Sequence, residues 1–95
     1  MVEVIQKNND QNGDFEIYFD GRKAGLMTYF WKNSETFVID HTEVDEAYGG
    51  KGLGKDLVIA AVNFARKNNY KIIPVCPFAK AIFRKDEEIQ DVLQS

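Results

Sequence analysis

The sequence predicts a single α/β domain, of the α+β kind, built on a mixed sheet. Residues that favour strands alternate with polar ones through the first half of the chain, a helical repeat of three and four begins at Leu53, and a short β-branched run begins at Lys71. The 95 residues are 44% hydrophobic and 28% charged, which fits one compact domain over residues 1–95. A chain of this size has material for one core and little more.

Four strands are predicted before the helix, at residues 2–6, 14–19, 23–31 and 36–43, where β-branched and aromatic residues alternate with polar ones. Turn residues separate them, namely Asn12-Gly13, Asp20-Gly21 and, as a weaker signal, Asn33-Ser34. Asparagine, aspartate and glycine tolerate the positive φ of tight turns. Consecutive strands are therefore expected to pair antiparallel, as a meander.

An amphipathic helix is predicted from the glycine-rich segment to about Asn68. Its apolar face is formed by Leu53, Leu57, Ala60, Ala61, Phe64 and Ala65. A strand at residues 71–75 follows, and a strand, helix, strand unit in one sheet makes a right-handed crossover between parallel strands. Pro77 suits the first turn of a last helical stretch over residues 78–93, with a break expected near Asp86.

Composition excludes several classes of protein. No apolar run approaches the roughly 20 residues that cross a bilayer, and the first ten residues lack the pattern of a signal peptide. The single cysteine excludes an internal disulfide framework. A net charge of -3 gives no general attraction to nucleic acid. We therefore expect a cytoplasmic protein with no nucleic acid or membrane partner.

The segment from Tyr48 to Lys55, Tyr-Gly-Gly-Lys-Gly-Leu-Gly-Lys, is the strongest local signal. Glycines let successive N–H groups point into one concavity, and the first N–H groups of a helix lack internal partners and lie at its positive end. Phosphate is the natural ligand of such a turn, with charge added by Lys51 and Lys55. The alternative is a glycine-rich loop that only turns the chain.

A nucleoside-triphosphate site is a less favoured alternative. The segment from Gly49 to Lys55 matches the start of the P-loop pattern, G-x-x-x-x-G-K. The next residue is Asp56, where a hydroxyl should bind Mg²⁺, and its carboxylate would repel the anion. The preceding strand is also predicted to end several residues before the loop.

The same segment resembles the pyrophosphate-binding motif of the GNAT acetyltransferase superfamily, Q/R-x-x-G-x-G/A, with Gly52 and Gly54 at the small positions. Three runs together, beginning at His41 (HTEV), Gly50 (GKGLG) and Pro74 (PVCPF), are similar to a small acetyltransferase-like family sometimes called the YjdJ type. The resemblance covers about residues 24–93. Two departures from the pattern are Gly49, where the superfamily has Arg or Gln, and Ile82, where an aromatic residue is common.

The resemblance implies a GNAT-like mixed sheet that binds acetyl-coenzyme A between the splayed ends of strands 36–43 and 71–75. The expected cofactor-binding residues are Glu43, Val44, Gly49, Gly50, Lys51, Gly52, Leu53, Gly54, Lys55, Phe78 and Arg84. The implied activity is transfer of the acetyl group to an unidentified primary amine, on a small molecule or on a protein lysine or N-terminus. The alternative is a coenzyme A-binding or protein-interaction module without catalysis.

Cys76 and His41 are the candidate catalytic residues. Cys76 precedes Pro77 at a predicted helix start, where the dipole lowers a thiol pKa, so it could protonate the leaving thiolate or accept the acetyl group. Its alternative role is that of a small buried hydrophobe. His41 is expected on the face of Phe37 and Ile39, as a base or as a core residue, and a dyad with Cys76 is a hypothesis.

Two further groups have a structural interpretation. The aromatic residues Tyr18, Tyr29, Phe30 and Trp31 are expected to pack in the core and across strands, with an acceptor groove as the alternative. One histidine and one cysteine do not make a metal-binding set, so no metal is expected.

Overall fold

A five-stranded sheet in the order β1-β2-β3-β4-β5 forms the base of the molecule. The structure is a computed structural model that describes residues 1–94 of the chain. The strands are β1 (Val2–Asn8), β2 (Asn12–Phe19), β3 (Arg22–Asn33), β4 (Thr36–Val44) and β5 (Lys71–Pro74). The first four pair antiparallel, and β5 pairs parallel to β4. The predicted mixed sheet, with its meander and parallel unit, is confirmed.

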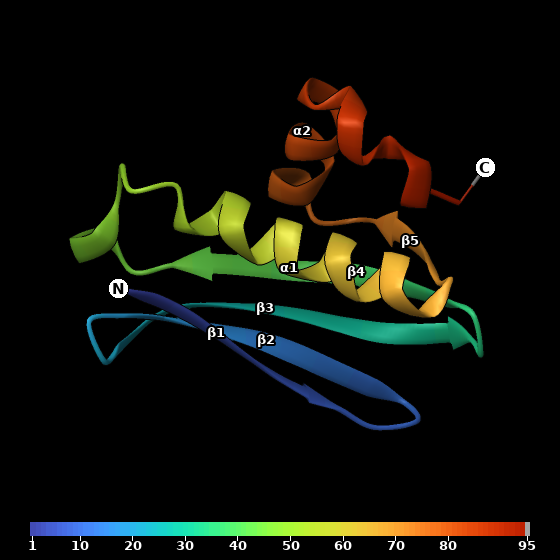
Figure 1. Ribbon diagram of the computed structural model, residues 1–95, viewed down its shortest axis with the longest axis horizontal. Coiled ribbons are helices and arrows are strands. Elements are labelled where there is room, and N and C mark those ends of the chain that lie inside the picture. The colour runs from blue at the N-terminus through green and yellow to red at the C-terminus, as the bar shows by residue number, and fades with distance from the viewer. Residues whose placement is uncertain (95) are drawn as a thin grey trace.

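Helix α1 (Leu53–Asn68) connects β4 to β5 and lies along one face of the sheet, with α2 (Pro77–Lys85) beside it (Figure 1). The core between them joins the inner side chains of the strands to both helices, including Tyr29, Phe37, Leu57, Val62 and Phe83. The apolar face of α1 is wider than predicted, because Val58 and Val62 are fully buried as well. Among residues 1–94, no helix has the length and apolar character to cross a membrane.

The last predicted helix is broken at Asp86, as expected. Asp86 has extended backbone angles, φ −116° and ψ 97°, and its side chain accepts from the N–H of Glu88. A 3-10 helix, η2 (Glu87–Val92), follows and buries Ile89 and Val92 against the core. The chain then returns to the sheet through a bridge between Leu93 and Ile72.

The predicted turn at Asn12-Gly13 is wrong. Both residues belong to β2, and the turn lies at residues 9–11, where the side chain of Asn9 accepts from the N–H groups of Gln11 and Asn12 at 2.8 and 2.9 Å. Gly13 instead allows Tyr29 to pack closely against β2, since a Cβ at residue 13 would lie 2.4 Å from the hydroxyl oxygen of Tyr29. The Asp20-Gly21 turn is confirmed, with φ of 49° and 84°.

A β-bulge in β4 shapes the end of the sheet that leads to the glycine turn. Ile39 pairs with Tyr29 and His41 pairs with Thr28, so Asp40 is an extra residue in the ladder. The extra residue reverses the alternation of faces beyond it. Thr42 is consequently turned toward the core side and His41 toward the outer face, where it is exposed. The prediction that His41 shares the face of Phe37 and Ile39 is therefore wrong.

Candidate functional site

The glycine turn lies between β4 and α1 and follows a short 3-10 helix, η1 (Glu46–Tyr48), that the side chain of Asp45 caps. Gly50 and Gly52 have φ of +79° and +75°, in the left-handed region that glycine adopts without strain. A Cβ at either position would meet no atom within 4 Å. The backbone of this turn is therefore open to a bulky group.

Helix α1 begins with N–H groups that have no partner in the helix. Gly52 is its N-cap and supplies no side-chain hydrogen bond, and the N–H of Asp56 donates to the carbonyl of Gly52 at 3.1 Å. The preceding N–H groups, those of Leu53, Gly54 and Lys55, therefore point out of the helix end. With the helix dipole behind them, they form a site that favours phosphate oxygens.

A groove of about 300 Å³ runs from this helix end to α2. Its lining consists of Val44, Tyr48, Gly49, Gly50, Gly52, Leu53, Gly54, Lys55, Phe78 and Ile82. Phe78 reaches the first turn of α1 because residue 54 is glycine: a Cβ there would lie 2.4 Å from the ring. Most of the predicted cofactor-binding residues thus come together in one groove.

The strands β4 and β5 part beside this groove. Their pairing ends at Ile39 and Pro74, and the carbonyl of Ile39 accepts from the N–H groups of both Val75 and Cys76, at 2.9 and 3.1 Å. Strand β4 continues alone to Val44. The N–H of Asp45 donates to Ala24 on β3, so the backbone groups of Thr42 and Val44 face the open edge.

Cys76 lies at the point where the strands part. It is 6% exposed, is the N-cap residue of α2, and precedes Pro77 in the first turn. Burial raises the pKa of the thiol, but the backbone amide of Ala79, the side chain of Thr42 and the backbone of Phe78 lower it, and the net pKa lies below its ordinary value. This thiol is buried and polarised at the same time.

His41 does not join Cys76. Its side chain is 58% exposed on the outer face of the sheet, and Nε2 lies 3.7 Å from Oε2 of Glu43. Cys76 instead faces Thr42, which the bulge turns to the opposite side of β4. The structure therefore does not support the hypothesis of a dyad between His41 and Cys76, while the role of each residue stays a prediction.

Three predicted cofactor-binding residues lie outside the groove lining. The ammonium of Lys51 lies 4.9 Å above the ring of Phe19. Glu43 lines a neighbouring groove with Lys23 and Asp45, and its register directs its backbone toward β3. Arg84 is exposed near the end of α2. Lys55, within the lining, is 4.0 Å from the carboxylate of Asp86.

Thr42 is the site residue that sequence reasoning missed. Its hydroxyl oxygen is buried and, within residues 1–94, has no hydrogen-bond partner. A signal for it does exist in the sequence, because Ile39 and Val44 are both apolar and five residues apart, and strict alternation would place them on opposite faces. An extra residue between them resolves the conflict and turns Thr42 inward.

An open glycine turn at a helix start, beside two parting parallel strands, is an arrangement that suits a phosphate-bearing ligand with an extended arm. Comparison with known proteins agrees. A family model described as GCN5-related N-acetyl-transferase matches residues 14–92. The chain therefore belongs to the GCN5-related N-acetyltransferase superfamily, and its fold is that of the superfamily. No curated protein matches it in sequence.

Solved structures resemble the chain as a whole. A GCN5-like protein from Staphylococcus aureus, solved by NMR, is 35% identical over 98% of this chain and 88% of its own, with a TM-score of 0.74. The ribosomal-protein-S18-alanine N-acetyltransferase of Escherichia coli shares the fold at 16% identity, over 82% of this chain and 53% of its own, with a TM-score of 0.69. A GNAT family acetyltransferase from Elizabethkingia anophelis with acetyl-CoA bound is 12% identical, over 77% of this chain and 63% of its own, with a TM-score of 0.66. The chain thus spans little more than half the length of the last two.

The residues present fit coenzyme A. The left-handed glycines leave a cradle that any Cβ would fill, and the N–H groups that start α1 suit a pyrophosphate. The free edge of β4 offers donors and acceptors to the amides of a pantetheine arm. Over residues 1–94, no three His, Cys, Asp or Glu side chains gather into a metal site.

Proposed function

We propose that the chain binds acetyl-coenzyme A in the glycine-turn groove and transfers the acetyl group to a primary amine. One observation carries the proposal: the open start of α1, Val44 at the free edge of β4 and Phe78 of α2 line one groove, and Cys76 precedes Phe78 by two residues. When bound, acetyl-coenzyme A supplies an activated thioester. The residues of this chain would bind the coenzyme, hold its arm and handle the protons of the reaction.

The glycine turn and the start of α1 would hold the phosphates, mainly through backbone N–H groups. Lys55 is near Asp86, and Lys51 lies over the ring of Phe19. Both positive charges would therefore act on the phosphates from the edge of the site. Thr42 and Val44 would hold the arm through their backbones, and Phe78 and Ile82 give the groove an apolar wall. This division predicts that backbone conformation matters more for binding than either lysine.

Cys76 would handle the proton or the acetyl group at the end of the arm. A neutral thiol can give its proton to a leaving thiolate, and a thiolate can attack the acetyl carbon. The lowered thiol pKa favours the thiolate and hence the second role. Intact-mass measurement after exposure to acetyl-coenzyme A should then detect a labile acetyl group on Cys76. Full activity of Cys76→Ala would exclude both roles.

His41 would take the proton of the attacking amine from the outer face. The imidazole and its Glu43 partner lie on the side of β4 opposite to Thr42, so an amine approaching that side meets a base without crossing the groove. The proposed proton acceptor and the thiol would then lie on opposite sides of β4.

Turnover is the decisive test. The purified chain is incubated with acetyl-coenzyme A and a panel of polyamines, amino acids and lysine peptides, and thiol release is followed. Release above the amine-free background is the expected result. Binding of coenzyme A without release from any amine would favour the second candidate, a binding module. The separation of His41 from Cys76 is the observation that favours this candidate. Stabilisation by Mg-ATP but not by coenzyme A would overturn both.

A further inference from the structure

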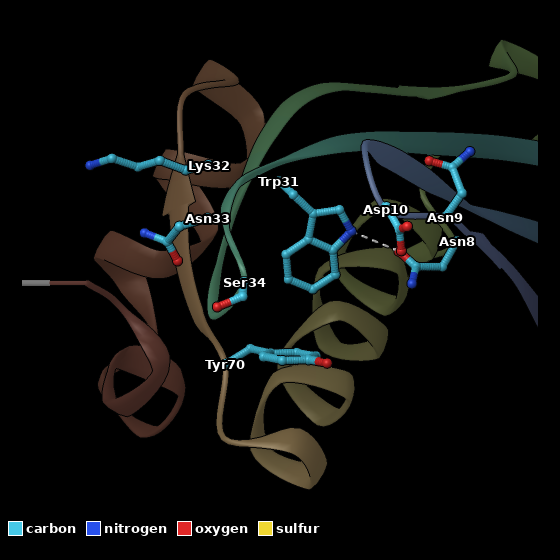
Figure 2. A pocket seen from close by; sticks show the side chains of 8 residues that line it. All are labelled: Asn8, Asn9, Asp10, Trp31, Lys32, Asn33, Ser34 and Tyr70. Carbon is cyan, nitrogen blue, oxygen red and sulfur yellow. Dashed lines mark hydrogen bonds between the residues drawn. The ribbon is translucent and has the colours of Figure 1, made fainter.

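A second groove lies where α1 ends, away from the glycine turn at which α1 begins. Its volume is about 510 Å³, and its walls come from the β1–β2 turn, the β3–β4 turn and Tyr70. Figure 2 shows Trp31 at its centre, with Asn8 and Asp10 on one side and Ser34 and Tyr70 on the other. We call it the Trp31 groove. Coenzyme A binding, as proposed above, makes no use of it.

A chain of hydrogen bonds fixes the side chain of Asn8 in this groove. Gln6 Nε2 donates to the hydroxyl of Tyr29 at 2.8 Å, and that hydroxyl donates to Asn8 Oδ1 at 2.8 Å. Trp31 Nε1 donates to the same oxygen at 3.0 Å. Because an indole nitrogen can only donate, the atom of Asn8 that faces it must be the oxygen. The amide nitrogen of Asn8, with its two donors, is therefore directed away from this network.

The aromatic wall of the groove is equally fixed. The ring of Trp31 stands nearly perpendicular to that of Tyr70, at 77° with 4.9 Å between centroids, and to that of Phe37, at 69° and 5.4 Å. Both Trp31 and Tyr70 are half-buried and line the groove. Rings held in this way present apolar surface at little cost in side-chain entropy.

Polar groups without partners complete the groove. Within residues 1–94, no hydrogen bond or ion pair occupies the carboxylate of Asp10 or the hydroxyl of Ser34. The oxygens of Asn9 and Asn33, by contrast, already accept from backbone N–H groups of their own turns. In Figure 2 the side chain of Lys32 extends away from Trp31, so the charge nearest the groove is negative.

We propose that the Trp31 groove binds a sugar of one or two rings. One face of a sugar ring consists of C–H groups and can pack on Trp31 or Tyr70, while its rim of hydroxyls both donates and accepts. Adjacent hydroxyls can donate to Asp10 and accept from Asn8. A phosphorylated ligand would meet the carboxylate of Asp10, and a purely apolar one would leave both polar groups without partners. The volume lies in the usual range for small-molecule sites.

The test is an NMR titration of the ¹⁵N-labelled full chain with glucose, galactose, N-acetylglucosamine and maltose. Trp31 is the single tryptophan, so its indole N–H signal and its fluorescence report on the groove directly. At the ligand efficiency typical of small polar molecules, a dissociation constant of about 1 mM is expected. Saturable shifts of Trp31, the Asn8 side-chain amide and Tyr70 with at least one sugar support the proposal. The absence of saturation with all four overturns it.

Two groove variants and one control then assign the contacts. Asn8→Asp keeps an oxygen for Tyr29 and Trp31 but removes the two donors, and Asp10→Ala removes the carboxylate from an exposed turn. Each should weaken sugar binding roughly tenfold, the loss of about one hydrogen bond. Asn63→Ala, at an exposed position on α1, is the matched control and should bind like wild type.

Two further outcomes would overturn the proposal. Unchanged sugar affinity in both groove variants would place the binding elsewhere. Saturable binding of adenosine, without saturable binding of any of the four sugars, would identify the groove as a nucleoside site. Ser34→Ala, also in an exposed turn, serves as a third groove variant if Asn8→Asp fails to fold. Coenzyme A binding is measured in every variant and should not change, since the two grooves share no residue.

Discussion

Thr42 and Cys76 face each other at the point where β4 and β5 part. The hydroxyl oxygen of Thr42 is buried without a hydrogen-bond partner among residues 1–94, and the side chain and backbone of Thr42 lower the pKa of the thiol against the effect of burial. Asp40 makes this contact possible, because the bulge turns Thr42 inward. The buried hydroxyl of residue 42 therefore lies beside the candidate catalytic thiol.

Replacing Thr42 by valine should raise the pKa of Cys76. Valine has nearly the same shape but no hydroxyl, and the loss of this polar neighbour should lower the thiolate fraction at neutral pH by roughly two- to tenfold. The pH dependence of alkylation by iodoacetamide measures this, with Thr42→Ser as the control that keeps the hydroxyl. An unchanged alkylation profile in Thr42→Val would show that the hydroxyl does not act on the thiol, whether or not the chain is an enzyme.

The lowered thiol pKa also makes stability depend on pH. The folded chain releases the thiol proton below the ordinary pKa of 9.0, whereas the unfolded chain still holds it there. The unfolded state therefore binds more protons in this window, and stability rises with pH. The contribution is complete above 9.0 and is lost as pH falls through the folded pKa. Urea unfolding with a reductant from pH 6 to 9.5 should show the free energy of unfolding of wild type rising relative to Cys76→Ala. A constant difference would contradict the prediction.

Periodicity and turn chemistry were sufficient to predict the sheet order, the parallel unit and the break at Asp86. They misplaced the first turn because Asn12-Gly13 satisfies the turn rule as well as residues 9–11 do. The position of Gly13 is decided by Tyr29, whose hydroxyl occupies the space of a Cβ. A contact between residues 16 positions apart in the sequence leaves no local signal.

The residues of the glycine-turn groove were largely predictable from the sequence, whereas the faces on which the side chains of β4 lie were not. Glycine spacing and the helix start identify Gly50, Gly52 and the N–H groups of α1, because these properties are local. The face of His41 depends on the register of β4 against β3, which one extra residue reverses. The positions of Lys51 and Arg84 depend on long flexible side chains, which sequence spacing does not place.

Gly13→Ala should be strongly destabilising. The new methyl group would lie 2.4 Å from the hydroxyl oxygen of Tyr29 and 2.5 Å from the backbone carbonyl of Lys7, so a core side chain and a neighbouring strand must both shift. Overpacking of this kind costs about 1–3 kcal/mol. Tyr29→Phe added to Gly13→Ala should restore only part of the loss, since the carbonyl remains. Chemical denaturation of Gly13→Ala, Tyr29→Phe and the double variant measures this, and a Gly13→Ala protein as stable as wild type would contradict it.

Gly52→Val should reduce coenzyme A affinity more than Lys55→Ala. Valine is strained at φ +75° by about 1–2 kcal/mol and projects into the open cradle, whereas Lys55 already lies 4.0 Å from Asp86. Gly21→Val is the matched control, because Gly21 has φ +84° with no atom near its Cβ position. It should lose similar stability and keep its affinity. Isothermal titration calorimetry with coenzyme A compares the three, and a larger loss in Lys55→Ala would assign the phosphates to side chains instead.

His41→Gln should abolish most turnover while leaving the fold and coenzyme A binding intact. The side chain is 58% exposed, so its replacement should change stability by less than about 0.5 kcal/mol. Loss of a general base typically costs about 10²–10⁴-fold in rate. Glu43→Gln, which keeps the shape of the partner at 3.7 Å and removes its charge, is the matched control and should reduce turnover less than His41→Gln. Wild-type rates in His41→Gln would assign the proton to another group and leave His41 as a surface residue.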